Sequence, residues 1–403
     1  MPQLTEPANL PQPPFNQTEL IFFNSTIRQT LRPTIPAQQI RIRLSNAFGG
    51  ADLPITRATI ALPRAERGQN ITGASGVQLE TLQTVTFSGN ESITVPLGAL
   101  AVSDPLNLPI NPGQVISISL YLRSGQASNS ITSHPGSRAV IWFSHGDYTS
   151  SANMTDPSTN QTQHWYFLSA VEAWQAPRYR AFVVVGDSIT DGRGSYVNTN
   201  SQWPNLLFNR LQESKSKSLE SVSVLNQGAG GNRVLNDGLG PSALERIDRD
   251  VLAHSGVEYA MLFSGVNDIG TADPTVVNQT TIGDRLIQAY AQITTRVHAA
   301  GIPIFGATIT PFGCYNSTLQ PYSDPIREET RLRVNDWIRN SGTFDAVVDF
   351  DAVLRDPRNS TQLAPWFDSG DCLHPNPAGY REMAADFPVD VFGRFEGGVR
   401  GFM

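Results

Sequence analysis

The sequence predicts an α/β domain with a parallel β-sheet sandwiched by helices, preceded by an all-β domain of the sandwich or jelly-roll type. Its 403 residues exceed what one hydrophobic core usually supports, so two domains are expected. Apolar and polar residues first alternate with period two, and after Trp174 apolar strands alternate with helical patterns instead. We therefore place a β-sandwich-like accessory domain at residues 1–176 and the α/β domain at residues 177–403.

Alternation defines the strands of the first domain. Ile40, Ile42 and Leu44 alternate with Arg41 and Arg43, which buries one face of the strand. Similar strand-like runs, separated by Gly, Pro, Asn and Asp, cover residues 55–62, 85–87, 93–97, 116–122, 140–143 and 165–171. Many short strands with such punctuation are typical of a sandwich or a jelly roll.

Five short apolar runs and the helical patterns between them define the second domain. The runs cover residues 182–185, 222–225, 259–264, 302–309 and 346–350. The clearest helix presents one apolar face made of Ile282, Leu286, Tyr290, Ile293 and Val297. Strands that alternate with helices form a parallel sheet, and the ligands of such a sheet bind beyond the carboxyl ends of its strands.

The composition excludes several classes of protein. The formal net charge is -7 and no cluster of Lys and Arg is present to neutralise phosphates, so a nucleic-acid partner is not expected. No apolar run approaches the roughly 20 residues of a membrane span, and residues 1–10 do not resemble a leader, so we expect a soluble mature chain. The 33 Gly and 28 Pro suit a loop-rich globular protein.

Nine Asn-x-Ser/Thr triplets favour a secreted, extracellular glycoprotein, although a chain rich in Asn, Ser and Thr also produces such triplets by chance. The acceptor positions are Asn16, Asn24, Asn70, Asn90, Asn153, Asn160, Asn278, Asn316 and Asn359. The only two cysteines, Cys314 and Cys372, are expected to form a disulfide in that oxidising compartment. The alternative is a pair of buried free thiols.

A serine follows the first strand of the second domain. Residues 183–192 read Val-Val-Val-Gly-Asp-Ser-Ile-Thr-Asp-Gly, so Ser188 lies on the turn that leaves a buried strand, where an exposed nucleophile belongs. The alternative is that Ser188 only caps the next helix. The Gly-x-Ser-x-Gly elbow of another class of serine hydrolases is excluded, because position 190 is Thr.

Two further strand ends carry glycine and asparagine. Residues 226–233 read Asn-Gln-Gly-Ala-Gly-Gly-Asn-Arg, and residues 264–268 read Ser-Gly-Val-Asn-Asp. Glycines allow backbone N–H groups to point into a crevice and the Asn267 side chain adds a neutral donor, so together they can bind a developing oxyanion. Taken singly, each of these motifs is usually only a turn.

An acid and a histidine lie close together near the end of the chain. Residues 371–375 read Asp-Cys-Leu-His-Pro, and Asp371 and His374, three positions apart on a loop, can contact each other. A neutral histidine accepts the proton of a serine hydroxyl, and a carboxylate on its other nitrogen fixes the tautomer. Asn376 and Pro377 then form a typical helix start.

In this order, Gly-Asp-Ser, Gly, Gly-x-Asn-Asp and Asp-x-x-His-Pro resemble the four sequence blocks of SGNH (GDSL-like) hydrolases over residues 180–395. The resemblance implies a flavodoxin-like sheet and a catalytic triad of Ser188, His374 and Asp371. It also implies an oxyanion hole made by the N–H groups of Ser188 and Gly231 and by the Asn267 side chain.

Two positions depart from the commonest pattern of that family. Ile189 stands where the family name has Leu, and Gly230 stands where a Ser often precedes the glycine of the second block. Neither position is a catalytic group. The assignment of Gly231 rather than Gly230 depends on counting five residues from Asn226.

No cofactor is expected. The histidines His134, His145, His164, His254 and His298 are scattered without the spacing of metal ligands. The sequence therefore indicates neither a metal site nor a dinucleotide site.

We accordingly expect a monomeric serine ester hydrolase that works through an acyl-enzyme on extracellular carbohydrate esters, acetyl esters above all. A lipase or acyl esterase acting on lipid or small-molecule esters is the alternative. A second alternative is a glycan-binding protein with a degenerate hydrolase scaffold, and the complete set of Ser, Gly, Asn and His argues against it. The first domain either binds ligand or only packs.

Overall fold

The chain divides into two compact units in the computed structural model, which describes residues 1–399. The first unit comprises Met1–Ala176 together with the short segment Val197–Asn200. The second unit comprises Pro177–Tyr196 and the chain from Ser201 onward. Within the part of the chain that the structure describes, no helix combines the length and the apolar character that a bilayer crossing requires.

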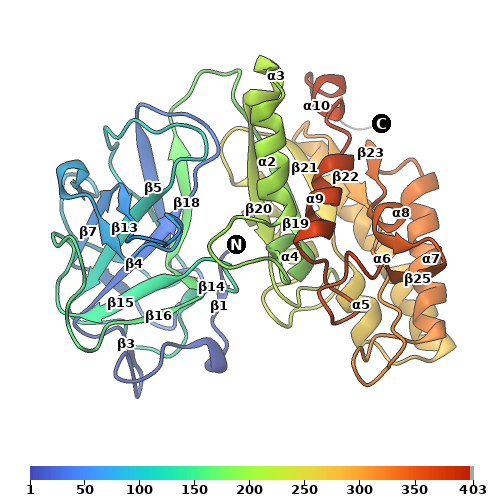
Figure 1. Cartoon of the computed structure of the whole chain (residues 1–403), viewed down its shortest axis with the longest axis horizontal. Helices are drawn as coiled ribbons and strands as arrows, with labels where there is room; N and C mark the ends of the chain where they lie inside the picture. Colours follow the sequence, from blue (N-terminus) through green and yellow to red (C-terminus); the bar gives the residue numbers. More distant parts are fainter. Residues whose placement is uncertain (400–403) are drawn as a thin grey trace. The chain divides into compact units, whose positions relative to one another are not determined.

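Antiparallel strands build the first unit (Figure 1). Its largest sheet has the strand order β10-β7-β13-β4-β15-β16, and two smaller sheets have the orders β12-β5-β18 and β1-β14-β17. Apolar side chains of the first two sheets, such as Ile27, Leu120 and Ile42, belong to one hydrophobic core, as in a β-sandwich. The strands are β1 (Gln3–Leu4), β2 (Asn16–Gln17), β3 (Leu20–Ile21), β4 (Ser25–Leu31), β5 (Ile40–Ser45), β6 (Leu53–Ile55), β7 (Arg57–Ala61), β8 (Pro63–Arg64), β9 (Gly76–Val77), β10 (Gln83–Val85), β11 (Ile93–Val95), β12 (Leu100–Val102), β13 (Ile116–Leu122), β14 (Thr132–Pro135), β15 (Ile141–His145), β16 (Asn160–Thr162), β17 (His164–Tyr166) and β18 (Leu168–Ala173), with 3₁₀ turns η1 (Pro7–Asn9) and η2 (Leu79–Thr81).

The second face of the six-stranded sheet is polar and yet buried, and Arg28 organises it. The Arg28 guanidinium donates to Ser119 Oγ and to the backbone carbonyls of Ser75, Tyr148, Ser151 and Ala152, at 2.8–3.2 Å. Burial lowers the pKa of Arg28 to about 10, so the group stays charged at neutral pH. One central cation thus fastens two irregular loops onto the sheet.

A five-stranded parallel sheet with the order β20-β19-β21-β22-β23 forms the middle of the second unit. Its strands are β19 (Arg180–Gly186), β20 (Val222–Gly228), β21 (Val257–Phe263), β22 (Ile304–Ala307) and β23 (Ala346–Val348). Successive residues of β19 point to opposite faces, because Phe182 and Val184 join one hydrophobic core whereas Val183 and Val185 join another. Both faces are therefore covered, as a parallel sheet requires.

Helices supply the two outer layers of this unit (Figure 1). Side chains of α2 and α9 belong to the core that contains Phe182, and side chains of α6 and α7 belong to the core that contains Val183. The elements outside the sheet are α1 (Ser188–Asp191), α2 (Trp203–Glu213), α3 (Lys217–Glu220), α4 (Ala243–Ile247), the π-helical turn η3 (Asp248–Leu252), α5 (Val266–Thr271), α6 (Val276–Ala299), α7 (Pro325–Asn340), α8 (Phe350–Leu354), α9 (Pro377–Asp386), α10 (Val391–Arg394), and the hairpin of β24 (Arg355–Asp356) and β25 (Asn359–Leu363).

The predicted α/β fold class and its flavodoxin-like parallel sheet are confirmed, with corrections at some strand ends. Residues 165–171 are not one strand, because Phe167 has φ 63° and interrupts the extended backbone. Residues 55–62 are likewise two strands that meet at Thr56. Phe350 does not end a strand, because the Asp349 side chain accepts the Ala352 N–H and begins helix α8 there.

Strand β4 was not predicted at all, although it is central to the six-stranded sheet. Its residues read Ser-Thr-Ile-Arg-Gln-Thr-Leu, so polar side chains interrupt the apolar alternation that marks the other strands. Those polar side chains are nevertheless buried, Arg28 at 1% exposed and Gln29 at 1%. The pattern failed here because the burial of this strand depends on hydrogen bonds rather than on apolar contacts.

We expect Arg28→Met to destabilise the first unit by at least about 3 kcal/mol, because each buried acceptor left without a donor costs about 1–3 kcal/mol. That loss corresponds to a fall in the melting temperature of roughly 6–12 °C for a unit of this size, measured by near-UV circular dichroism. Arg67→Met, at an exposed position, is the matched control and leaves the transition unchanged. Equal melting temperatures of the two variants would show that the stability of the loops does not depend on Arg28.

Candidate active site

The turn after β19 presents Ser188 at the first position of α1. The Asp187 side chain, and not that of Ser188, caps this helix by accepting the Ile189 N–H at 2.9 Å. The alternative that Ser188 only serves as a cap is therefore wrong. Gly186 precedes the turn at a position where a Cβ atom would lie 2.3 Å from Thr190 Oγ1 and 2.9 Å from the Phe263 carbonyl oxygen. Only glycine fits this tight exit from the strand.

The structure brings Ser188, His374 and Asp371 together in one chain of hydrogen bonds. Ser188 Oγ lies 2.8 Å from His374 Nε2, and His374 Nδ1 lies 2.6 Å from Asp371 Oδ2. Ser188 is 5% exposed and His374 is 4% exposed. Burial alone would raise the pKa of Asp371, but the hydrogen bond and the charge of His374 hold it well below its usual range. Asp371 is thus ionised and orients the imidazole.

Several contacts fix the loop that carries Asp371 and His374. The predicted disulfide between Cys314 and Cys372 is present, and it joins this loop to the segment that follows β22. Asp371 also accepts the His374 backbone N–H at 2.8 Å, and its own carbonyl accepts a hydrogen bond from the Gln320 side chain at 3.0 Å. The loop that holds His374 is therefore cross-linked to the segment that follows β22.

The predicted donor Gly231 lies on the loop after β20, and Asn267 lies in the first turn of α5, which follows β21. Gly231 has φ 67°, a left-handed conformation that favours glycine. The Asn267 amide donates one N–H to the Asn232 carbonyl at 2.9 Å, and its Oδ1 accepts from the Tyr322 hydroxyl at 3.1 Å. These two contacts fix the orientation of the amide and leave its second N–H as a donor.

Hydrogen bonds connect the three strand ends to one another. The Ala229 N–H donates to the Gly186 carbonyl at 3.1 Å, which ties the loop after β20 to the serine turn. The Asp268 carboxylate accepts the N–H groups of Val234 and Leu235 at 2.8 and 2.9 Å, which ties helix α5, after β21, to the loop after β20. The candidate serine and the candidate donors thus belong to one connected framework.

Arg246 is the residue of this framework that the sequence did not reveal. Its guanidinium, 1% exposed, donates to the Gly186 and Gln227 carbonyls at 3.0 and 2.8 Å and to Asn232 Oδ1 at 3.1 Å. It also forms an ion pair with Asp250 at 2.9 Å. Arg246 and Asp250 are four residues apart, a spacing that predicts an ion pair on one face of a helix. This spacing does not reveal that the pair is buried, because it is also common on exposed helices.

Two further acids are buried below the serine turn. Burial raises the pKa of Asp187 to about 7, with the Asp268 charge adding to the effect and the Ile189 N–H and Arg246 opposing it. Burial also raises the pKa of Asp268 to about 6, against the hydrogen bonds from Val234 and Leu235. Because both oxygens of Asp268 accept N–H groups, Asp187 is the one that holds its proton more readily.

Two aromatic residues that closely follow Ser188 in the sequence differ in their exposure. Trp203, the first residue of α2, is fully buried in the core, whereas Tyr196 is 65% exposed. No group of three or more His, Cys, Asp or Glu within residues 1–399 is arranged to hold a metal ion. Of the nine predicted glycosylation positions, Asn16 is half-buried and the other eight are exposed.

Residues 182–387, about half of the chain, match the protein family described as GDSL-like Lipase/Acylhydrolase. No curated protein sequence matches the chain. Among solved structures, a GDSL-like lipase from Bacteroides thetaiotaomicron is 15% identical over 55% of this chain and 92% of its own, with a TM-score of 0.39. A catalytic mutant of an acetylxylan esterase from Geobacillus stearothermophilus is 19% identical over 52% and 92%, with a TM-score of 0.37. A carbohydrate acetylesterase family member from Sinorhizobium meliloti is 13% identical over 53% and 98%, with a TM-score of 0.40.

We expect Asp187→Asn to change how stability depends on pH. The ordinary pKa of Asp is about 3.9, so between pH ~4 and pH ~7 folded Asp187 keeps a proton that the unfolded chain has released. The stability contributed by that proton is present below pH ~4 and is lost as the pH rises through about 7. The Asn variant lacks this titration and can still cap Ile189.

The variant should therefore gain stability relative to wild type as the pH rises through this window. Urea unfolding at pH 4.5, 6 and 8 measures the difference, with the exposed Asp386→Asn as control. A difference that stays constant across the three pH values contradicts the raised pKa of Asp187.

Proposed function

Because the chain belongs to the GDSL-like lipase/acylhydrolase family, we propose that it is a serine ester hydrolase with a catalytic triad of Ser188, His374 and Asp371. One observation carries the proposal. Ser188 Oγ and the Asp371 carboxylate lie 2.8 and 2.6 Å from the two ring nitrogens of the same buried histidine. That arrangement is what a nucleophile, its general base and the group that orients the base require.

In the acylation step, Ser188 Oγ attacks the ester carbonyl carbon while its proton passes to His374 Nε2. Asp371 stabilises the resulting imidazolium through the 2.6 Å hydrogen bond to Nδ1. The tetrahedral intermediate collapses when the bond to the alkoxy group breaks, and the imidazolium gives its proton to the leaving alcohol. Ser188 then carries the acyl group as an ester.

In the deacylation step, a water molecule takes the place of the alcohol. His374 accepts a proton from this water as the water oxygen attacks the acyl carbon. The bond to Ser188 Oγ breaks, the imidazolium returns the proton to the serine, and the free acid leaves. The same residues thus act twice, first to form the acyl-enzyme and then to hydrolyse it.

The negative oxygen of both intermediates needs fixed donors. We assign this role to the backbone N–H groups of Ser188 and Gly231 and to the free N–H of the Asn267 amide. The contacts of Asn267 with Asn232 and Tyr322 support this, because a donor that is already oriented needs no reorganisation when charge develops.

For the substrate, we favour esters of extracellular carbohydrates, with acetyl as the acyl group. The exposed glycosylation triplets support a secreted protein, and an extracellular location favours polysaccharide esters as substrates. Two exposed aromatic residues lie beside the loop segments that the disulfide joins: Tyr315, 84% exposed, and Trp366, 54% exposed. Their rings offer faces against which sugar rings can stack. Esters of lipids or small molecules are the second candidate, because the same exposed rings also fit an acyl chain.

Ser188→Ala should abolish hydrolysis of short 4-nitrophenyl esters while the melting temperature stays within a few degrees of wild type. The substitution removes the nucleophilic oxygen and no core contact. A serine-directed phosphonate should label wild type at Ser188 and leave the variant unlabelled, which peptide mass spectrometry measures. Labelling at another serine would contradict the assignment of Ser188 as the nucleophile.

Asn267→Ala should lower kcat about 10²–10³-fold with a smaller change in KM, which is the usual cost of losing one oxyanion donor. Tyr322→Phe is the matched control, because it removes only the hydroxyl that holds Asn267 Oδ1, and its kcat should fall less. Steady-state kinetics on an acetyl ester measures both. If kcat of Asn267→Ala is unchanged and only stability falls, the amide is structural.

A further inference from the structure

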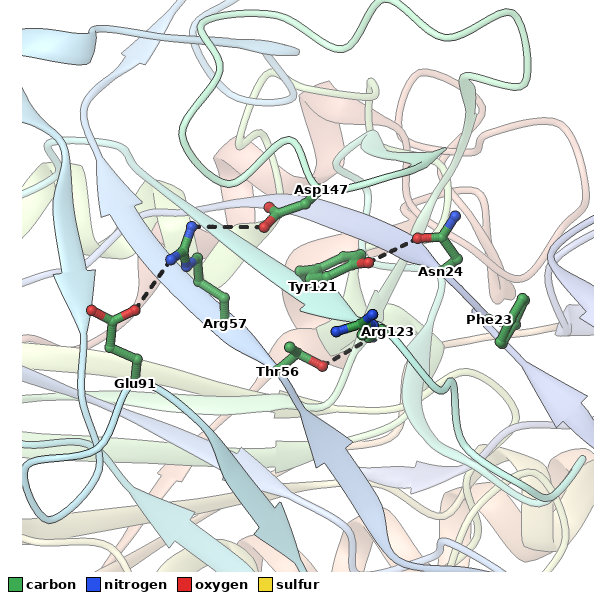
Figure 2. Close-up of a pocket in the computed structure, with 8 residues that line it drawn as sticks. All are labelled: Phe23, Asn24, Thr56, Arg57, Glu91, Tyr121, Arg123 and Asp147. Atoms are coloured by element: carbon green, nitrogen blue, oxygen red, sulfur yellow. Dashed lines mark hydrogen bonds and ion pairs between the residues drawn. The ribbon is translucent and has the colours of Figure 1, made fainter.

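A pocket of about 540 Å³ lies at one end of the six-stranded sheet and is lined by residues of the first unit alone (Figure 2). Strands β4 and β7 begin at this end, and β13 and β15 finish there. Asn24 immediately precedes β4, Arg57 begins β7, Tyr121 lies near the end of β13 and Asp147 follows β15. Four strands thus direct side chains into one concave region.

The backbone on one side of this pocket holds an aromatic ring at the surface. Phe22 has φ 58° and Asn24 has φ 46°, both left-handed, a conformation that Asn tolerates and that is unfavourable for Phe, and they flank Phe23. Phe22 is fully buried, whereas Phe23 is 45% exposed. The Asn24 N–H donates to the Arg123 carbonyl at 3.2 Å, and the Asn24 carbonyl accepts from Gly146 at 2.7 Å. The segment is therefore fixed with the Phe23 ring facing solvent.

The polar groups of the pocket orient one another before any ligand arrives. The Tyr121 hydroxyl donates to Asn24 Oδ1 at 2.8 Å, which leaves the amide N–H groups of Asn24 and the lone pairs of Tyr121 for a ligand. Arg57 lies between Glu91 at 3.3 Å and Asp147 at 3.8 Å, as Figure 2 shows. Asp147 is itself held by the Thr149 N–H at 2.9 Å. Binding of a ligand therefore requires little further ordering of these side chains.

We infer that this pocket binds a neutral saccharide. The lining contains two arginines, Arg57 and Arg123, and two acids, Glu91 and Asp147, so the formal charges cancel and neither an anion nor a cation is favoured. Sugar hydroxyls both donate and accept, which suits planar amide, carboxylate and guanidinium groups that face one opening. The C–H face of a sugar ring is apolar and stacks on an aromatic ring such as Phe23.

The saccharide has two sources, and the chain itself is one of them. Asn24 begins the glycosylation triplet Asn24-Ser25-Thr26, and its exposed amide lies on the pocket wall. A glycan on this amide would enter the pocket from the chain's own surface. Without it, the pocket is open to a free polysaccharide, and the experiment must separate the two.

The test uses the full chain carrying Ser188→Ala, so that the result does not depend on ester turnover. Protein made in bacteria, which lacks N-glycans, is titrated calorimetrically with xylohexaose, cellohexaose, mannohexaose and hexagalacturonate. Phe23→Ala and Tyr121→Phe are added to remove the stacking face and the hydroxyl. Trp174→Ala, which changes an 83% exposed aromatic of the same unit outside the pocket, is the matched control. Melting temperatures confirm that each variant folds.

Binding of a neutral hexasaccharide that weakens at least tenfold in Phe23→Ala and Tyr121→Phe, and not in Trp174→Ala, supports an external glycan. If none binds, protein from a glycosylating host is compared before and after enzymatic removal of its N-glycans, in wild type and in Phe23→Ala. A melting temperature that falls on this removal, but not in Phe23→Ala, supports the chain's own glycan as occupant. Binding of hexagalacturonate alone, loss of binding only in Trp174→Ala, or no response in either arm overturns the inference.

Discussion

The arrangement of the candidate active site depends on one buried guanidinium. Arg246 contacts the carbonyl groups at the ends of β19 and β20, at Gly186 and Gln227, together with the Asn232 side chain. Carbonyl groups at the ends of parallel strands need donors from beyond the sheet, and at Gly186 the Ala229 N–H and Arg246 both donate. A single group with five N–H donors in a fixed plane satisfies several of them at once. The starts of α1 and α5, which carry Ser188 and Asn267, are therefore attached to strand ends and loops that one group connects.

A buried cation also determines the acids around it. Asp250 neutralises Arg246, and although burial alone would raise the pKa of Asp250, the arginines Arg246 and Arg249 lower it overall. Asp187, by contrast, does not pair with Arg246 directly, and burial raises its pKa to about 7. The framework thus contains one ionised acid that holds the cation and two acids, Asp187 and Asp268, whose pKa values burial raises to about 7 and about 6. Asp187 caps the helix that begins with Ser188, so the stability of the serine turn is linked to pH.

The sequence predicted the parts of this site that depend on strand order and on residue type. Ser188, Asp371 and His374 follow apolar runs or precede a helix start, and the topology of a parallel sheet brings strand ends to one edge. Arg246, Tyr322 and strand β4 were not predicted, for a common physical reason. Arg246 and the polar residues of β4 are buried largely through hydrogen bonds to distant partners, such as Asn232 for Arg246, 14 residues away. The half-buried Tyr322 likewise contacts Asn267, 55 residues away, and no local periodicity records such partners.

In both units a buried arginine donates hydrogen bonds to backbone carbonyl groups. In the first unit Arg28 donates to four loop carbonyls above the polar face of a sheet, and in the second Arg246 donates to carbonyls beyond the strand ends. Burying such a charge costs free energy, and an apolar core would be more stable. Apolar side chains, however, cannot fix the direction of a carbonyl or an amide. The proposed oxyanion site needs donors whose directions are set beforehand, and a buried cation that fixes the strand ends meets that need at a cost in stability.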